Sequence, residues 1–182
     1  LNVSLADDVP SNIKIIVIAE LKEPLTEIEE IHLERYIARG GNLFITCEPN
    51  RSEVMNVLLE KFGVQLSSGT LVQLNENFSP DLIVAKPTRE AAELNYYFDE
   101  MKRNDRCLAM SGVAGLEYDG NKGYHVIPLF ISDSLTWNEV ETINFVDERP
   151  VLSASMGEIQ KSYATVLALT REVCNKEQKI MI

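Results

Sequence analysis

One cysteine stands where a catalytic nucleophile would stand in an α/β sheet. Cys47 ends the apolar run 43–47, and ligands of open α/β sheets gather at the carboxyl ends of strands. A nucleophile on a tight strand-to-helix turn needs small neighbours, but Cys47 is flanked by Thr46 and Glu48. A reactive thiolate also needs an electropositive setting, which Glu48 opposes. We therefore predict that Cys47 is a buried thiol without a catalytic role.

The loop after Cys47 is the first candidate contact site. Glu48, Asn50 and Arg51 lie between this strand and a helix that we expect to begin with Ser52 as its cap. Free backbone N–H groups at helix N-termini bind anions. We predict that these three residues contact a small ligand or a partner; simple capping and turn formation is the alternative.

The second candidate site surrounds the only tryptophan. Trp137 follows Ser132 and Ser134 in a polar segment. An indole offers a large flat face with one hydrogen-bond donor, which suits a sugar or a peptide. In the alternative interpretation, Trp137 anchors a long loop onto the sheet, as buried aromatic side chains usually do.

We expect no metal site and no cofactor. The chain has two histidines and three cysteines. The cysteines show no C-x-x-C pair, and an odd number does not form a disulfide framework. A zinc site needs several ligands at suitable spacing, and neither His32 nor His125 has such neighbours.

The bulk composition limits the class of partner. The 182 residues carry a formal net charge of −11, so the phosphates of nucleic acids and anionic membranes would be repelled. The length suits one domain with a sizeable core, and no apolar run reaches the ~18–20 residues of a membrane span. The chain starts with Leu1 and stops within an expected strand, so we expect a single α/β domain, residues 1–182, excised from a longer protein.

A strand–helix–strand unit positions the first candidate site. Residues 13–19 and 43–47 are nearly all apolar and β-branched or aromatic, which is typical of strands covered on both faces. Between them, Thr26 and Glu29 form a capping box, and Gly40 follows the helix as its stop. Such a unit places its two strands parallel, with the helix on one face.

The rest of the chain predicts further strands and helices. We expect a hairpin turn at 67–69, one helix from Pro87 to about residue 103, and an edge or bulged strand at 124–131 because it contains Pro128. Two strands near the C-terminus, 162–171 and 178–182, join through Asn175. Together these elements predict a three-layer α/β domain: a mostly parallel sheet with helices on both faces, and mixed strands in the C-terminal part.

Three stretches carry a family resemblance. The first stretch comprises residues 16–19, 24–29 and 36–43, the second is 128–139, and the third comprises 164–171 and 175–180. The second is the most discriminating, because it contains the segment Ser-Asp-Ser-x-Thr-Trp-x-Glu. The chain resembles the extracytoplasmic region of the gliding-motility-type auxiliary proteins of ABC transporters, also called the uncharacterised ABC-type transport system family.

The resemblance implies a fold of the class I glutamine amidotransferase type and no established reaction. It also implies a domain on the periplasmic or extracytoplasmic face of the inner membrane, anchored through the parent protein. The expected partners are membrane or ATPase-complex subunits of an ABC transporter, with a small ligand in addition and no nucleic acid. We predict a non-enzymatic accessory or binding domain; the alternatives are an amidotransferase-like hydrolase using Cys47 and a purely structural spacer.

Overall fold

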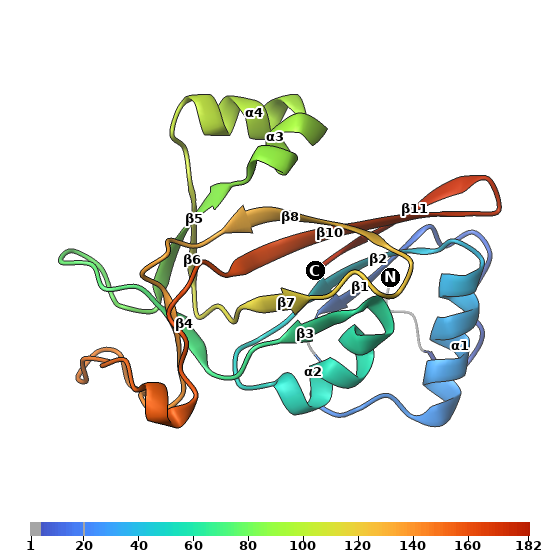
Figure 1. The fold of residues 1–182 in the computed structure, drawn as a ribbon. Helices are drawn as coiled ribbons and strands as arrows, with labels where there is room; N and C mark the ends of the chain where they lie inside the picture. Colours follow the sequence, from blue (N-terminus) through green and yellow to red (C-terminus); the bar gives the residue numbers. More distant parts are fainter. Residues whose placement is uncertain (1–4, 20) are drawn as a thin grey trace.

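The predicted strand–helix–strand unit is present near the start of the chain, between Ile15 and Thr46. The computed structural model (Figure 1) describes residues 5–19 and 21–182. Strand β1 (Ile15–Ala19) pairs in parallel with β2 (Asn42–Thr46), and helix α1 (Glu27–Ala38) connects them. The parallel pair predicted from the sequence is therefore confirmed.

Helix α1 begins and packs as its sequence dictates. The predicted capping box is present: Glu29 N–H donates to Thr26 Oγ1, and Thr26 N–H donates to Glu29 Oε2 at 2.9 Å. Leu33, Tyr36 and Ile37 are buried against the sheet. The apolar side chains of its first turns lie outside this contact, since Ile28 is 60% exposed, so α1 is less buried than its composition predicts.

Nine strands form one curled sheet in the order β1-β2-β11-β10-β8-β5-β6, with β3 and β7 paired beside β10. Strands β4 and β9 form a separate two-stranded sheet. The remaining strands are β3 Val64–Leu66, β4 Thr70–Val72, β5 Leu82–Pro87, β6 Leu108–Ser111, β7 Leu116–Tyr118, β8 His125–Ile131, β9 Trp137–Glu139, β10 Ala164–Val173 and β11 Lys176–Met181. The remaining helices are α2 Ser52–Leu59, α3 Arg89–Leu94 and α4 Tyr96–Arg103, with 3₁₀ turns η1 Glu60–Phe62 and η2 Ala154–Met156.

The strand directions correct the predicted sheet. Among the described residues, only β1–β2 and β2–β11 pair in parallel, and every other strand pair is antiparallel. The α/β class is confirmed, but the prediction of a mostly parallel sheet is wrong. Parallel neighbours need long crossovers. Strands β10 and β11 follow one another through a tight turn at Cys174 and Asn175, both with positive φ, so they pair antiparallel.

The predicted hairpin at residues 67–69 is also wrong. Strand β3 pairs with β7, and β4 pairs with β9, so the two strands flanking Gly69 do not pair with each other. Gly69 has a φ of +77°, and a Cβ there would collide with the backbone of Glu139 on β9. The glycine thus marks a close approach between two segments far apart in sequence.

Two more boundaries differ from the sequence prediction. The helix expected from Pro87 is two helices, because Asn95 is extended (φ −152°, ψ 136°) and its side chain caps α4 at Tyr97 N–H. Strand β8 is bulged, as Pro128 indicates, since its register with β10 shifts between Phe130 and Pro128. It is not an edge strand, because β10 and β5 flank it.

Helices lie on both sides of the sheet but over different strands. Helices α1 and α2 share one core with β1, β2, β10 and β11, through residues such as Ile16, Ile45 and Leu167. Helices α3 and α4 share another core with β5 and β8, together with Ala168 on the opposite side of β10. Figure 1 shows α3 and α4 on one side of the sheet and α1 and α2 on the other. The second side of β1 and β2 therefore has no covering helix among the described residues.

No helix within residues 5–19 and 21–182 combines the length and apolar character of a membrane span.

Candidate functional site

The first predicted contact residues lie on an exposed turn. Glu48, Asn50 and Arg51 are all exposed between β2 and α2. Asn50 adopts a φ of +61°, a conformation that Asn tolerates better than most residues. Arg51, and not Ser52, occupies the N-cap of α2, and no side chain caps this helix through a hydrogen bond. The expectation of a Ser52 cap is therefore wrong.

Cys47 sits half-buried at the root of this turn. Burial, reinforced by the neighbouring Glu48 carboxylate, raises the pKa of its thiol to about 11. The two histidines lie on other elements: His32 Nδ1 on α1 is 2.8 Å from the carbonyl oxygen of Leu5, and His125 on β8 stands opposite Thr170 in the pairing of β8 with β10. A protonated thiol is a weak nucleophile, so this setting opposes covalent chemistry at Cys47.

The second predicted contact group is mostly internal. Trp137 is 3% exposed, and its indole N–H donates to Glu139 Oε2 at 3.1 Å. Ser132 is 4% exposed, and its hydroxyl accepts a hydrogen bond from Tyr163 N–H at 2.9 Å. Only Ser134 is exposed. The arrangement favours the alternative in which Trp137 anchors the loop.

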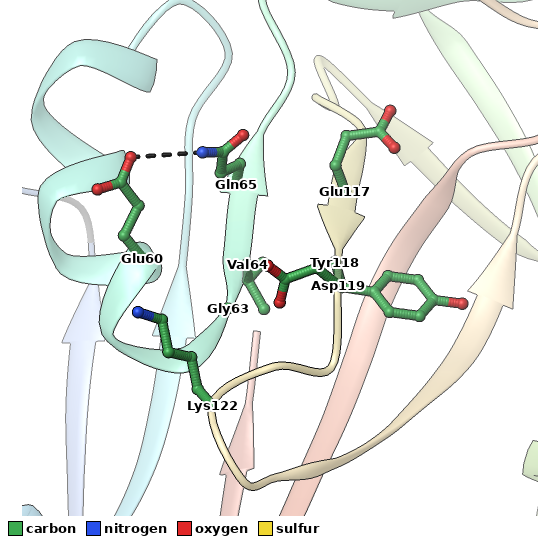
Figure 2. A pocket seen from close by; sticks show the side chains of 8 residues that line it. All are labelled: Glu60, Gly63, Val64, Gln65, Glu117, Tyr118, Asp119 and Lys122. Atoms are coloured by element: carbon green, nitrogen blue, oxygen red, sulfur yellow. Dashed lines mark hydrogen bonds between the residues drawn. The ribbon is translucent and has the colours of Figure 1, made fainter.

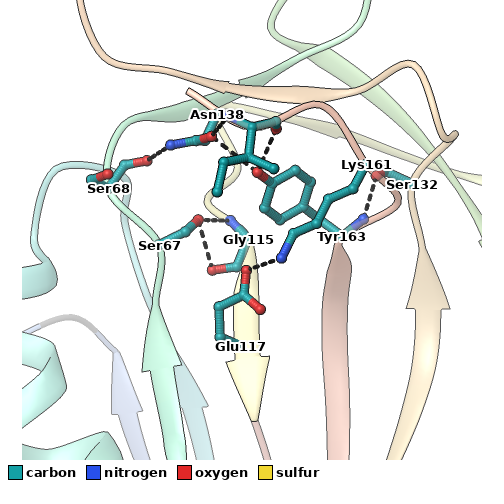
Figure 3. A network of polar contacts seen from close by, with 9 residues as sticks. Ser67, Ser68, Gly115, Glu117, Ser132, Asn138, Lys161 and Tyr163 are labelled. Atoms are coloured by element: carbon teal, nitrogen blue, oxygen red, sulfur yellow. Dashed lines mark hydrogen bonds and ion pairs between the residues drawn. The ribbon is translucent and has the colours of Figure 1, made fainter. Parts of the chain in front are cut away.

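A polar network holds this loop on the sheet (Figure 3). Asn138 Oδ1 lies 2.9 Å from Tyr163 Oη and accepts Ile159 N–H at 2.8 Å, while Asn138 Nδ2 donates to Ser68 O at 3.2 Å. Lys161 Nζ lies over the Tyr163 ring, 4.8 Å from its centroid. Burial raises the pKa of Tyr163 to about 12. The Tyr163 hydroxyl therefore stays protonated at neutral pH, and its hydrogen bonds serve to position the segments that meet here.

Two buried carboxylates shape the base of the same loop. Glu139 is 2% exposed and accepts the backbone N–H groups of Glu141 and Thr142 at 3.1 and 2.9 Å. Glu158 is 3% exposed and accepts Val140 N–H and Ser153 N–H at 3.1 and 2.6 Å. Buried carboxylates are tolerated when such donors surround them, so these two residues fix the path of the loop.

A pocket between η1 and β7 is acidic (Figure 2). It measures about 370 Å³, and the carboxylates of Glu60, Glu117 and Asp119 line it together with Lys122. Glu117 pairs with Lys161 at 2.6 Å, and Asp119 Oδ1 accepts Asn121 N–H at 3.0 Å. The described residues contain no group of three or more His, Cys, Asp or Glu side chains placed to bind a metal ion.

The uncovered side of the sheet carries a row of apolar side chains, which we call the open face: Ile15, Val17, Phe44 and Met181. They are 59%, 60%, 39% and 38% exposed, respectively. The strand register places Val17 beside Phe44 and Phe44 beside Met181. The row is therefore continuous across three strands.

A pocket of about 240 Å³ opens at one end of the open face, and we call it the β2 pocket. Phe44 and Met181 belong to both features, and Cys47 lies in its wall. The carboxyl ends of β2 and β11 meet here, so the pocket occupies the edge of the sheet where ligands were expected. Its other lining residues are mostly apolar; the 110–114 segment and the start of β10 supply several of them, and Leu66 on β3 and Leu116 on β7 add to the wall.

The sequence pattern contained the signal for the open face. Residues 15–18 are apolar without alternation, and this pattern predicts burial on both sides of a strand. The structure buries Ile16 and Ile18 and leaves Ile15 and Val17 exposed. The pattern therefore identified apolar side chains on both sides, but not which side lacks a cover within this chain.

Comparison with known proteins decides the family. The family model described as "ABC-type uncharacterized transport system" matches residues 1–173. The chain belongs to this family. No curated protein sequence matches the chain significantly.

Solved structures resemble the fold of this ABC-transport auxiliary domain. One of them carries the description "mmIFT52 N-terminal domain", with a TM-score of 0.57 and 16% sequence identity. The match covers 94% of this chain and 65% of that chain, so this domain corresponds to less than two thirds of the matched structure. At this identity the likeness shows a common fold and carries no function.

Proposed function

We propose that this domain is a non-catalytic binding module of an ABC transport system and that its open face docks a subunit of that system. The apolar row across β1, β2 and β11 carries this proposal. Ile15 and Val17 are 59% and 60% exposed although every residue of their strand, β1, is apolar. Contiguous apolar surface of this kind is typical of protein interaction sites.

The size of the β2 pocket supports a protein partner. Ligand pockets usually measure about 300–1,000 Å³, and this one measures about 240 Å³. That volume suits one or two side chains of a docked partner better than a complete small ligand. The exposed residues Glu48, Asn50 and Arg51 on the adjoining turn would supply polar contacts at the rim.

A catalytic role is disfavoured by the setting of Cys47. An amidotransferase-like hydrolase needs a thiolate and a base in hydrogen-bond reach, and the pKa of this thiol is about 11. The proposal also keeps the extracytoplasmic location and the anchoring of the parent protein that the family resemblance implies. Fusing reporters active on only one side of the membrane to the full-length protein would test that location.

Site-specific photo-crosslinking tests the docking proposal. A benzophenone side chain replaces Phe44 in the full-length protein, expressed with its transport system. The matched control replaces Ile28, which is 60% exposed on α1 on the covered side of the sheet. We expect an adduct with a membrane subunit of the transporter from position 44 only. Equal adducts from both positions, or none from position 44, would reject this docking surface.

A further inference from the structure

A second apolar surface lies at the far end of the molecule from α1. The loop after β4 and the loop after β9 both project there (Figure 1), and residues of both line one pocket. They enclose a groove of about 520 Å³, which we call the acidic groove. Its walls combine apolar and acidic side chains: Leu74, Phe78, Val146, Glu76, Asp147 and Glu148.

The apolar side chains of this region are unusually exposed. Val146 is 90% exposed, Phe78 55% and Leu74 49%. Ile143, on the same loop as Val146, is 89% exposed. Single exposed apolar residues are normal on a protein surface, but a cluster around a groove indicates an interaction site.

Hydrogen bonds hold the groove in shape. Asn144 Nδ2 donates to Asp147 Oδ2 at 2.8 Å, its Oδ1 accepts Val146 N–H at 3.1 Å, and its backbone carbonyl accepts Glu148 N–H at 3.0 Å. The opposite loop is closed by Gln73 N–H donating to Pro80 O at 2.8 Å. Since the loops are braced, the apolar side chains are presented outward by a defined backbone.

The charge of the groove selects its occupant. Glu76, Asp147 and Glu148 are opposed in the lining by Arg149 alone. A second copy of this chain, with a net charge of −11, would be repelled, and so would an anionic membrane. A partner segment with lysine or arginine beside large apolar side chains matches both the charge and the apolar walls.

The geometry points to a second docking site: the acidic groove binds a partner protein through a basic segment that carries large apolar side chains. This inference is independent of the docking proposed for the open face, because the two surfaces share no residue. Either surface can fail its test without affecting the other.

Fluorescence anisotropy with a defined peptide tests the acidic groove. The probe is a fluorescein-labelled peptide in which Phe and Leu stand between pairs of lysines; its counterpart carries glutamates instead. We expect the lysine peptide to bind and the glutamate peptide not to bind. The double substitution Glu76→Gln with Glu148→Gln should weaken binding about fivefold, because each rim charge contributes modestly. Val146→Ser should weaken it by a similar factor.

The matched control removes the same charge elsewhere. Glu23 and Glu53 are exposed outside the groove, so Glu23→Gln with Glu53→Gln should change binding less than twofold. If both double variants lost the same peptide affinity, the loss would come from the change in net charge alone, and the site would be rejected. Binding to phosphatidylcholine vesicles without binding to the peptide, or dimerisation that Val146→Ser abolishes, would also overturn the proposal.

Discussion

Cys47 differs from the other two cysteines in exposure and therefore in reactivity. Cys107 and Cys174 are exposed, whereas Cys47 is partly buried with a thiol pKa of about 11. At neutral pH only roughly one Cys47 thiol in 10,000 is ionised, against a few per cent for an ordinary thiol. We expect iodoacetamide to modify Cys107 and Cys174 first and Cys47 only after unfolding, as measured by peptide mass spectrometry. Rapid modification of folded Cys47 would restore the nucleophile hypothesis.

Glu139 is the carboxylate whose protonation should affect stability. Burial raises its pKa, but hydrogen bonds from Thr142 N–H, the Trp137 indole and Glu141 N–H, together with one to the Glu158 carboxyl, outweigh burial and hold the pKa below its ordinary value. The folded state therefore binds this proton more weakly than the unfolded state does. The resulting stability is present at neutral pH and is lost as the pH falls below the ordinary carboxyl pKa of about 4.3 and through the lowered folded value.

The Glu139→Gln variant separates this contribution from other acid effects. Glutamine keeps one acceptor oxygen for the Glu141 and Thr142 N–H groups, but its NH2 group cannot accept the hydrogen bond that the Trp137 indole donates to Glu139 Oε2. The variant should therefore lose about 1–3 kcal/mol at neutral pH. It should also show a smaller fall in stability on acidification, as measured by urea unfolding at several pH values. Glu141→Gln, an exposed neighbour, is the control and should match the unmodified protein at each pH.

At the scale of elements, Gly69 fixes how β4 meets β9. A Cβ at this position would collide with the Glu139 backbone, and its φ is +77°. At Gly120, φ is +67° and no atom lies within 4 Å of the added Cβ. Gly120→Ala should therefore cost only the backbone strain of about 1 kcal/mol, while Gly69→Ala should cost about 3 kcal/mol or more. Equal losses in thermal unfolding would show that the close approach is unimportant.

At the scale of the whole molecule, the two sides of β1 and β2 should respond differently to substitution. Val17→Thr with Phe44→Thr changes only the open face, and we expect the free energy of unfolding to change by less than about 1 kcal/mol. Leu33→Ala removes a side chain with no exposed surface on the covered side and should cost about 2–5 kcal/mol. Urea unfolding of the isolated domain measures both. If both variants lost a comparable free energy of unfolding, the side chains of the open face would have to be buried in the isolated domain.

Short-range sequence signals were sufficient to predict several helices and strands correctly. The capping box of α1, the apolar runs of β1 and β2 and the two C-terminal strands appear where the sequence predicts them. Each of these signals depends on neighbours within a few residues, because hydrogen bonds and dihedral preferences act over that range. The 67–69 hairpin prediction failed because it considered only neighbouring residues, whereas β3 pairs with β7 and β4 pairs with β9, which are both distant in the sequence.

By itself, the sequence determined an α/β domain with a parallel β1–β2 pair and a family membership. Only the tertiary structure decided that the sheet is mixed, that Trp137 is internal and that one side of β1 and β2 lacks a cover within the described chain. The physical reason is that strand pairing and burial depend on which distant segments come together. An apolar pattern records that a side chain avoids water, but not whether its cover comes from the same chain or from a partner.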